Sequence, residues 1–233
     1  MQATTELLVG VDVAGRTVLK RIHCEVPLIV RVGESCDATL TLLFVNGSAG
    51  PLGGDELLLA VVVEDGASVR VRSVGASIVQ PGTTVASSSL RTTLEVGADA
   101  TVDWELEPTV SVARSRHRSS TLLRLAATSS LRFRETVCLG RFEEQSGTLA
   151  IHQRLVVDGV GVLDHETVFG GGALRGPGGQ GHHRVHRSTV LVRDDAPSAP
   201  SAQVTAGAIA GTFPLRNRIA LVTSSADSLS DLV

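Results

Sequence analysis

Short stretches that alternate apolar and polar residues, or that are rich in β-branched residues, recur along the chain. Gly, Asp, Asn and Ser separate these stretches at close spacing. Many short strands with turn residues between them are typical of an all-β sandwich, barrel or superhelix. The expected strands cover residues 57–63, 68–74, 89–96, 100–106, 121–125, 131–139, 148–157 and 189–192.

Helical patterns are scarce. The best one lies near the end of the sequence, where Leu215, Ile219, Val222 and Leu229 approximately follow helical spacing, and it predicts a helix over residues 214–232. Several Ser and Thr residues inside this segment have low helix propensity and weaken the prediction. The sequence therefore indicates an all-β fold with at most one or two short helices.

A comparison of the sequence with itself aligns four segments at one constant offset. Gly66, Gly97, Thr128 and Gly159 align at a turn, and the alternating apolar positions after them align as well. Each unit resembles a hairpin whose apolar face is buried only when it stacks on its neighbours. This pattern predicts a superhelical or sandwich-like stack of β-hairpin units. Because Gly turns occur in any all-β protein, a chance agreement is the alternative.

Two segments are expected to form loops. Residues 170–181 are rich in Gly, and residues 194–201 contain Pro197 and Pro200. Neither segment separates two stretches that could each build a complete core. We therefore expect a single domain over residues 1–233.

The charge balance argues against a nucleic-acid partner. The chain has 24 acidic and 21 basic residues, and Lys20 is its sole lysine. It has no basic run with interleaved aromatic residues that could follow a phosphate backbone. No apolar run reaches the roughly 20 residues needed to cross a bilayer, and the first residues lack the features of a signal peptide. A cytoplasmic protein that binds neither nucleic acid nor membrane is expected.

The motifs of common enzymes are missing from the sequence. There is no phosphate-binding loop of the G-x-x-x-x-G-K-[ST] type, and there is no G-x-S-x-G elbow or H-E-x-x-H helix. The chain is therefore not expected to be an enzyme.

Three histidines form the sharpest metal-like feature. His182, His183 and His186 follow the Gly-rich loop, and on a strand His182 and His186 would share one face. Two imidazoles on one face could hold Ni²⁺, Cu²⁺ or Zn²⁺. Two neighbouring arginines, Arg184 and Arg187, would repel a dication, so surface histidines at the exit of a flexible loop are the alternative.

Carboxylates offer a second set of metal candidates. Glu107 is two residues from Glu105, and Asp164 is two residues from Glu166, so each pair faces one way on a strand. Loosely held oxygens of this kind suit a cation in transit, because weak sites release what they bind. A solvated strand face is the alternative explanation for both pairs.

Several small motifs follow one another in a characteristic order. They are Gly54-Asp55 before an apolar strand, Gly75-Ala76, Val96-Gly97-Ala98 leading to Trp104, Leu139-Gly140-Arg141, Asp158-Gly159 and Glu166. In their order and spacing, the residues from 53 to 169 resemble the urease accessory protein UreD family, also called UreH. The matched positions Gly54, Asp55, Trp104, Gly140 and Arg141 are candidates for structural or partner contacts.

The resemblance implies a nearly all-β superhelical protein without catalytic activity. It implies partners of three kinds, namely a UreF-type accessory protein, a UreG-type GTPase and apo-urease. It also implies that Ni²⁺ passes through an internal channel in transit, with no cofactor bound permanently. Family channel residues cannot be transferred, because residues 77–81 and Pro108 depart from the family pattern. The alternative from the residues alone is a metal-dependent hydrolase that uses His182, His183 and His186.

Overall fold

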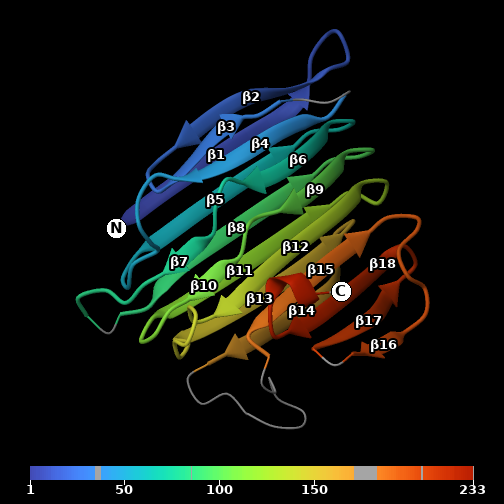
Figure 1. Cartoon of the computed structure of the whole chain (residues 1–233). Helices are drawn as coiled ribbons and strands as arrows, with labels where there is room; N and C mark the ends of the chain where they lie inside the picture. The colour runs from blue at the N-terminus through green and yellow to red at the C-terminus, as the bar shows by residue number, and fades with distance from the viewer. Residues whose placement is uncertain (35–37, 85, 171–182, 206, 233) are drawn as a thin grey trace.

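Two β-sheets stack face to face in the computed structural model, which describes residues 1–34, 38–84, 86–170, 183–205 and 207–232. The strands run side by side in two layers from the N-terminal to the C-terminal end of the chain (Figure 1). Within the described residues, the seven-stranded sheet contains, in spatial order, β14 (Val160–Phe169), β13 (Thr148–Val157), β11 (Arg116–Leu125), β8 (Ser88–Val96), β5 (Glu56–Val63), β1 (Gln2–Val11) and β2 (Thr17–Cys24).

The second sheet has eleven strands in the same described part of the chain. Two short strands, β7 (Ser77–Val79) and β10 (Thr109–Ser111), lie off the main order of this sheet, where β10 pairs with β12 (Ser130–Leu139) and β7 pairs with β10. Its strands are β16 (Ser201–Val204), β17 (Ala208–Arg216), β18 (Ile219–Ala226), β15 (Val185–Val192), β12 (Ser130–Leu139), β9 (Thr101–Glu105), β6 (Ser68–Ser73), β4 (Leu40–Asn46) and β3 (Leu28–Val32), with β7 (Ser77–Val79) and β10 (Thr109–Ser111).

The predicted stack of repeated units is confirmed, and the structure shows how the units are built. In β5–β6, β8–β9 and β11–β12 the first strand lies in the seven-stranded sheet and the second in the eleven-stranded sheet. Equivalent strands of successive units pair in parallel, β5 with β8 and β8 with β11, then β6 with β9 and β9 with β12. The turn between the two strands of a unit therefore crosses from one sheet to the other. Each two-strand unit forms one coil of a superhelix. Only the unit β13–β14 is a hydrogen-bonded hairpin within one sheet.

The pairing register of these coils shows that the offset between successive units is not constant, although the sequence comparison predicts a constant one. Val63 pairs with Val96, and Val96 pairs with Leu125. The first of these steps is longer than the interval from Gly66 to Gly97, and the second is shorter. In this register Asp99 (φ 56°), not Gly97, occupies the left-handed turn position that Gly66 (φ 70°) holds one coil earlier.

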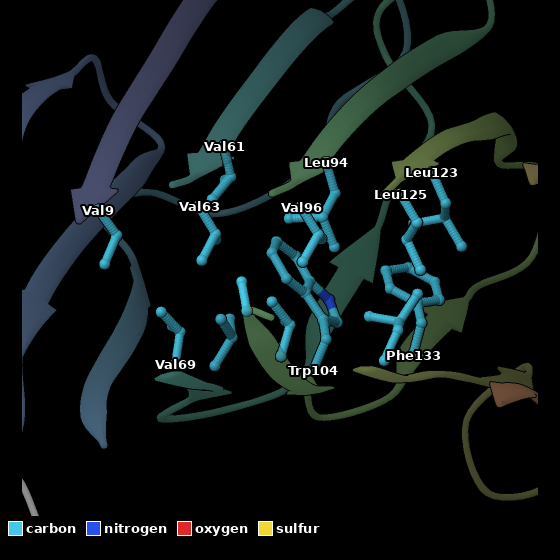
Figure 2. Close-up of a cluster of buried hydrophobic side chains, with 14 of the residues drawn as sticks. Val9, Val61, Val63, Val69, Leu94, Val96, Trp104, Leu123, Leu125 and Phe133 are labelled. Atoms are coloured by element: carbon cyan, nitrogen blue, oxygen red, sulfur yellow. The ribbon is translucent and has the colours of Figure 1, made fainter. Parts of the chain in front are cut away.

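The core fills the space between the sheets because every second strand residue faces inward. Side chains of β5, β8 and β11 point from one sheet toward Trp104 and Phe133 on the other (Figure 2). The ring centroid of Trp104 lies 5.7 Å from that of Phe133 and 5.8 Å from that of Phe44. Burying one such large side chain stabilises the fold by roughly 1.5–3 kcal/mol.

The helix predicted over residues 214–232 is wrong. This segment contains the end of β17, the whole of β18 and a single 3₁₀ turn, Leu229–Asp231. β18 pairs with β15, which places Ile219 and Leu221 in the core opposite Val192 and Val190. Sheet pairing satisfies the backbone and buries the apolar residues at alternate positions, so tertiary packing overrides the weak helical spacing.

The predicted Gly-rich loop lies almost wholly outside the described residues, and only its first residue, Gly170, is described. Among the described residues, no helix is long and apolar enough to cross a membrane.

Candidate functional site

A band of polar side chains crosses the interior between the two sheets. It separates the main apolar core from a smaller apolar cluster of Val137, Leu139, Leu149, Ile151 and Phe169. Burying polar groups costs free energy unless they find hydrogen-bond partners, so such a band needs an explanation beyond packing. Its members on β8, β11, β12 and β13 include Thr92, Ser119, Thr121, Glu135 and Gln153.

Glu135 is the carboxylate at the centre of this band. Ser119 Oγ donates a hydrogen bond of 2.9 Å to Glu135 Oε1, and Gln153 Nε2 donates one of 2.9 Å to Glu135 Oε2. Gln153 is itself oriented by Ser188, whose hydroxyl donates to Gln153 Oε1 at 2.8 Å. Desolvation raises the pKa of Glu135, while the bonds from Ser119 and Gln153 act in the opposite direction.

Glu135 faces a cavity of about 80 Å³. A water molecule needs roughly 10–15 Å³ of such volume, so the cavity has room for several waters or a partly hydrated cation. The lining includes His117, Ser119 and Glu135 in the interior and the exposed Glu107. The cavity therefore has one half-buried carboxylate, Glu135, and one exposed carboxylate, Glu107, in its lining. Arg134 also lines it, but the Arg134 guanidinium donates to Glu105 at 2.6 Å.

His117 is the only histidine in the lining of this cavity as the described residues define it. It is 4% exposed, and its Nδ1 lies 2.9 Å from Ser88 Oγ. Burial lowers the pKa of His117 to about 4, so the imidazole is neutral at pH 7.

Glu107 is the one sequence-predicted metal candidate that the structure places at this cavity. Asp164 and Glu166 lie on β14, an edge strand of the seven-stranded sheet. Asp164 Oδ1 is 2.6 Å from His152 Nε2, and Glu166 pairs with Arg118. The hydrogen bond from His152 lowers the pKa of Asp164.

The three candidate histidines are not assembled into a metal site by the described structure. His182 lies outside the described residues, and His183 Nδ1 is 2.9 Å from Asp227 Oδ1. Both ring nitrogens of buried His186 are engaged, Nδ1 with Ser225 Oγ at 2.7 Å and Nε2 with the His183 carbonyl at 3.1 Å. In the part of the chain that the structure describes, no three His, Cys, Asp or Glu residues gather to hold a metal.

Comparison with known proteins identifies the family of this fold. The family profile described as "UreD urease accessory protein" matches residues 2–229. The chain belongs to the UreD family. It is 34% identical over 229 residues to a urease accessory protein UreD of Streptomyces coelicolor, covering 97% of this chain and 90% of the relative.

Other UreD proteins show the same degree of similarity. The chain is 32% identical to one from Streptomyces avermitilis, with 97% of this chain and 91% of the relative covered. It is 36% identical to one from Frankia alni, with 81% and 69% covered. UreD is a family of accessory proteins and not of catalytic enzymes, so the hydrolase alternative is wrong.

The UreD-like motif residues have structural roles in this chain. Gly54 adopts φ 94°, a left-handed conformation that favours Gly. Buried Asp55 accepts a hydrogen bond from the Leu52 N–H at 2.9 Å, which fixes the same turn. Trp104 lies in the core at 2% exposure.

The Leu-Gly-Arg motif of this UreD-family chain also shapes a turn. Gly140 has φ 78°, and the Arg141 N–H donates to Glu144 Oε2 at 3.1 Å. The Arg141 carbonyl accepts from Arg184. The Arg141 side chain is exposed, and a partner contact at the matched positions stays a prediction.

Two residues that line the cavity of this UreD-family chain, Trp104 and Glu107, were sequence-predicted candidates, whereas Glu135 and His117 were not. Glu135 carried a usable signal, because the alternation within the predicted strand 131–139 puts it on the same face as Phe133 and Val137. A lone carboxylate on an apolar strand face indicates a function or a buried partner. His117, Gln153 and Ser188 carried no comparable signal.

Proposed function

We propose that this chain acts in urease maturation as a scaffold that passes Ni²⁺ through the cavity beside Glu135. In this proposal it binds apo-urease together with a UreF-type accessory protein and a UreG-type GTPase, and it holds no permanent cofactor. The observation that carries the proposal is the position of the Glu135 carboxylate, which lines a cavity between the sheets.

The charge of Glu135 supports passage of a cation. Its two hydrogen-bond partners, Ser119 and Gln153, are both uncharged. A half-buried carboxylate without a cationic partner carries a desolvation cost, and an entering dication would offset that cost. A fold that only needed stability would be better served by an apolar side chain at this position.

The small number of strong donors supports transit over storage. Besides Glu135, the described lining offers hydroxyl oxygens, one imidazole, the Asn46 amide and the Glu107 carboxylate. Tight metal sites use three or four strong ligands held together, whereas few and flexible ligands release what they bind. Ni²⁺ is therefore the cargo in this proposal, bound briefly on its way to the enzyme.

The partners follow from the chemistry that this chain lacks and from its relatives. The sequence contains no phosphate-binding loop, so a GTP-dependent step requires a separate GTPase. The relatives carry the name urease accessory protein, which supports apo-urease as the receiving protein.

The test is activation of apo-urease at limiting Ni²⁺ with Glu135→Gln. The amide keeps the shape of the side chain and removes its charge, so we expect at least a tenfold loss of urease activation. Glu166→Gln is the matched control, because Glu166 is an exposed carboxylate on β14 of the seven-stranded sheet, away from the cavity, and pairs with Arg118.

Both variants should still co-purify with the accessory partners and apo-urease, since neither substitution alters the backbone. Full activation by Glu135→Gln at limiting Ni²⁺ would contradict passage through this cavity. An equal loss with Glu166→Gln would also contradict it, because the effect would then not depend on the cavity.

A further inference from the structure

We propose that His117 is a nitrogen ligand in the cavity and makes it selective for borderline cations such as Ni²⁺ over hard cations such as Mg²⁺. This inference rests on the proposed function, because it assigns a selectivity to the same passage. It is carried by the placement of His117, by its hydrogen bond to Ser88 and by the nitrogen that this bond leaves free.

The strand geometry places His117 two residues along β11 from Ser119, the residue that contacts Glu135. His117 and Ser119 are both inward-facing residues of β11, and Ser119 contacts the Glu135 carboxylate. Two residues along a strand correspond to roughly 7 Å. All three side chains line the same cavity. A cation that leaves Glu135 toward the start of β11 therefore meets the imidazole next.

The hydrogen bonds around Ser88 determine which ring nitrogen is free. Ser88 Oγ donates to the carbonyl oxygen of Arg116 at 3.3 Å and lies 2.9 Å from His117 Nδ1. A hydroxyl has one proton, and a carbonyl can only accept. Both contacts therefore exist together only when Nδ1–H donates to Ser88, which leaves the lone pair on Nε2.

This arrangement is the one found around metal-binding histidines. Such a histidine usually donates its second ring N–H to a neighbouring acceptor, which fixes the tautomer and the ring orientation. In His117 the acceptor is Ser88, and the described residues provide no hydrogen-bond partner for Nε2. Burial keeps the ring neutral at pH 7, so a proton does not occupy the lone pair.

His186 shows that burial alone does not produce this arrangement. It is also buried and also neutral at pH 7. Both of its nitrogens, however, are bonded to protein groups, namely Ser225 and the carbonyl of His183, and it does not line the cavity. The chain thus contains a buried structural histidine that serves as an internal control.

The selectivity follows from ligand chemistry. Mg²⁺ and Ca²⁺ bind oxygen donors, and the cavity offers these at Glu135, Ser119 and Thr121. Imidazole is a good ligand for Ni²⁺, Cu²⁺ and Zn²⁺. A single imidazole beside a single carboxylate therefore favours the borderline ions without building a site that traps them.

The test compares His117→Asn with His186→Asn in the purified full-length chain. Asparagine keeps a polar group near the place of Nδ1 and removes Nε2. Calorimetric titrations with Ni²⁺ and with Mg²⁺ give two dissociation constants for each protein. For His117→Asn we expect at least about a tenfold weaker Ni²⁺ affinity with unchanged Mg²⁺ affinity. His186→Asn should bind both ions like the unaltered chain.

Glu135→Gln separates this inference from the proposed function. It should weaken the binding of both ions, because it removes charge and not a nitrogen donor. If Glu135→Gln abolishes urease activation while His117→Asn keeps the original ratio of Ni²⁺ to Mg²⁺ affinity, the proposed function stands and the selectivity role of His117 is wrong. If neither variant changes Ni²⁺ binding or urease activation, both are wrong.

A measurement on the unaltered chain covers the case in which His117→Asn fails to fold. In long-range ¹H–¹⁵N spectra with labelled histidines, Zn²⁺ should shift the Nε2 signal of one neutral buried histidine whose Nδ1 carries the proton. The second buried histidine should not respond. Absence of any shift at saturating Zn²⁺ would overturn the inference.

Discussion

Ser119 on β11 and Glu135 on β12 meet across the two sheets through a hydrogen bond of 2.9 Å. The two strands belong to one coil of the superhelix, with β11 in the seven-stranded sheet and β12 in the eleven-stranded sheet. The Glu135 carboxylate therefore extends from the eleven-stranded sheet and is held by two donors of the opposite, seven-stranded sheet, Ser119 and Gln153. A rigid frame of this kind keeps a charged side chain at the cavity wall although the charge itself is costly.

The free-energy cost of desolvating Glu135 predicts that Glu135→Gln is more stable than the unaltered chain but inactive in urease activation. Because desolvation raises the pKa of Glu135 in the folded protein, its contribution to stability is present below the unfolded pKa and is lost as pH rises through the folded pKa. Glu135→Gln should therefore unfold at a higher urea concentration than the unaltered chain at pH 7. The gap between the two should shrink as the pH falls toward 4. A lower stability of Glu135→Gln at pH 7 would show that the carboxylate is not penalised by burial.

Gln153 positions the Glu135 carboxylate, and replacing Gln153 should lower the free energy of unfolding strongly. Gln153→Leu keeps the volume but removes the partner of Glu135 Oε2 and of the Ser188 hydroxyl, while Ser119 still donates to Glu135 Oε1. Each buried polar group left unsatisfied costs roughly 1–3 kcal/mol, so we expect a loss of several kcal/mol in the free energy of unfolding. Replacement of the exposed neighbour Arg154 by Ala should change the urea midpoint little. Equal midpoints for the two variants would contradict the role of Gln153.

His186 should make the fold sensitive to mild acid. Burial lowers the pKa of His186 from 6.5 to about 4 in the folded protein, so its stabilising contribution is present above pH 6.5 and is lost as the pH falls toward 4. A shift of this size corresponds to roughly 3 kcal/mol. His186→Asn should flatten the dependence of the unfolding free energy on pH between 6.5 and 4. A slope equal to that of the unaltered chain would contradict the assignment.

The fold could be predicted from sequence because its dominant forces are local and periodic. Alternation of apolar and polar residues specified β5, β6, β8, β9, β11, β12, β13 and β15, and Gly turns marked where several of them end, whereas the other strands of the described structure were not predicted. The C-terminal segment was mispredicted because Leu215, Ile219 and Val222 are compatible with weak helical spacing. Pairing of β18 with β15 and β17 decides the outcome, and that long-range contact leaves no local trace in the sequence.

The candidate site was only partly predictable for a related physical reason. Glu107 was found because paired carboxylates are visible as a pattern, and the structure places it at the cavity. Asp164 and Glu166 belong to the same pattern but occupy the outer face of edge strand β14. Glu135 and His117 are isolated in the sequence, and their neighbours in the cavity come from other strands. Their importance depends on how the coils stack, which no residue spacing encodes.

The last prediction concerns the turns of the superhelix, where Gly66 and Gly97 align in sequence but are needed for different structural reasons. Gly66 has φ 70°, and a side chain added there would meet no atom within 4 Å. Gly97 has no such backbone requirement, but an added Cβ would lie 2.7 Å from the backbone nitrogen of Asp65.

Gly66→Asn should therefore be nearly neutral, because Asn tolerates the left-handed conformation and Asp99 already adopts it one coil later. Gly97→Ala should cost roughly 1–3 kcal/mol, because it forces neighbouring coils apart. Urea unfolding of the two variants decides the matter. Equal losses would favour the constant offset, under which both glycines hold the same position, over the uneven register that the paired strands adopt.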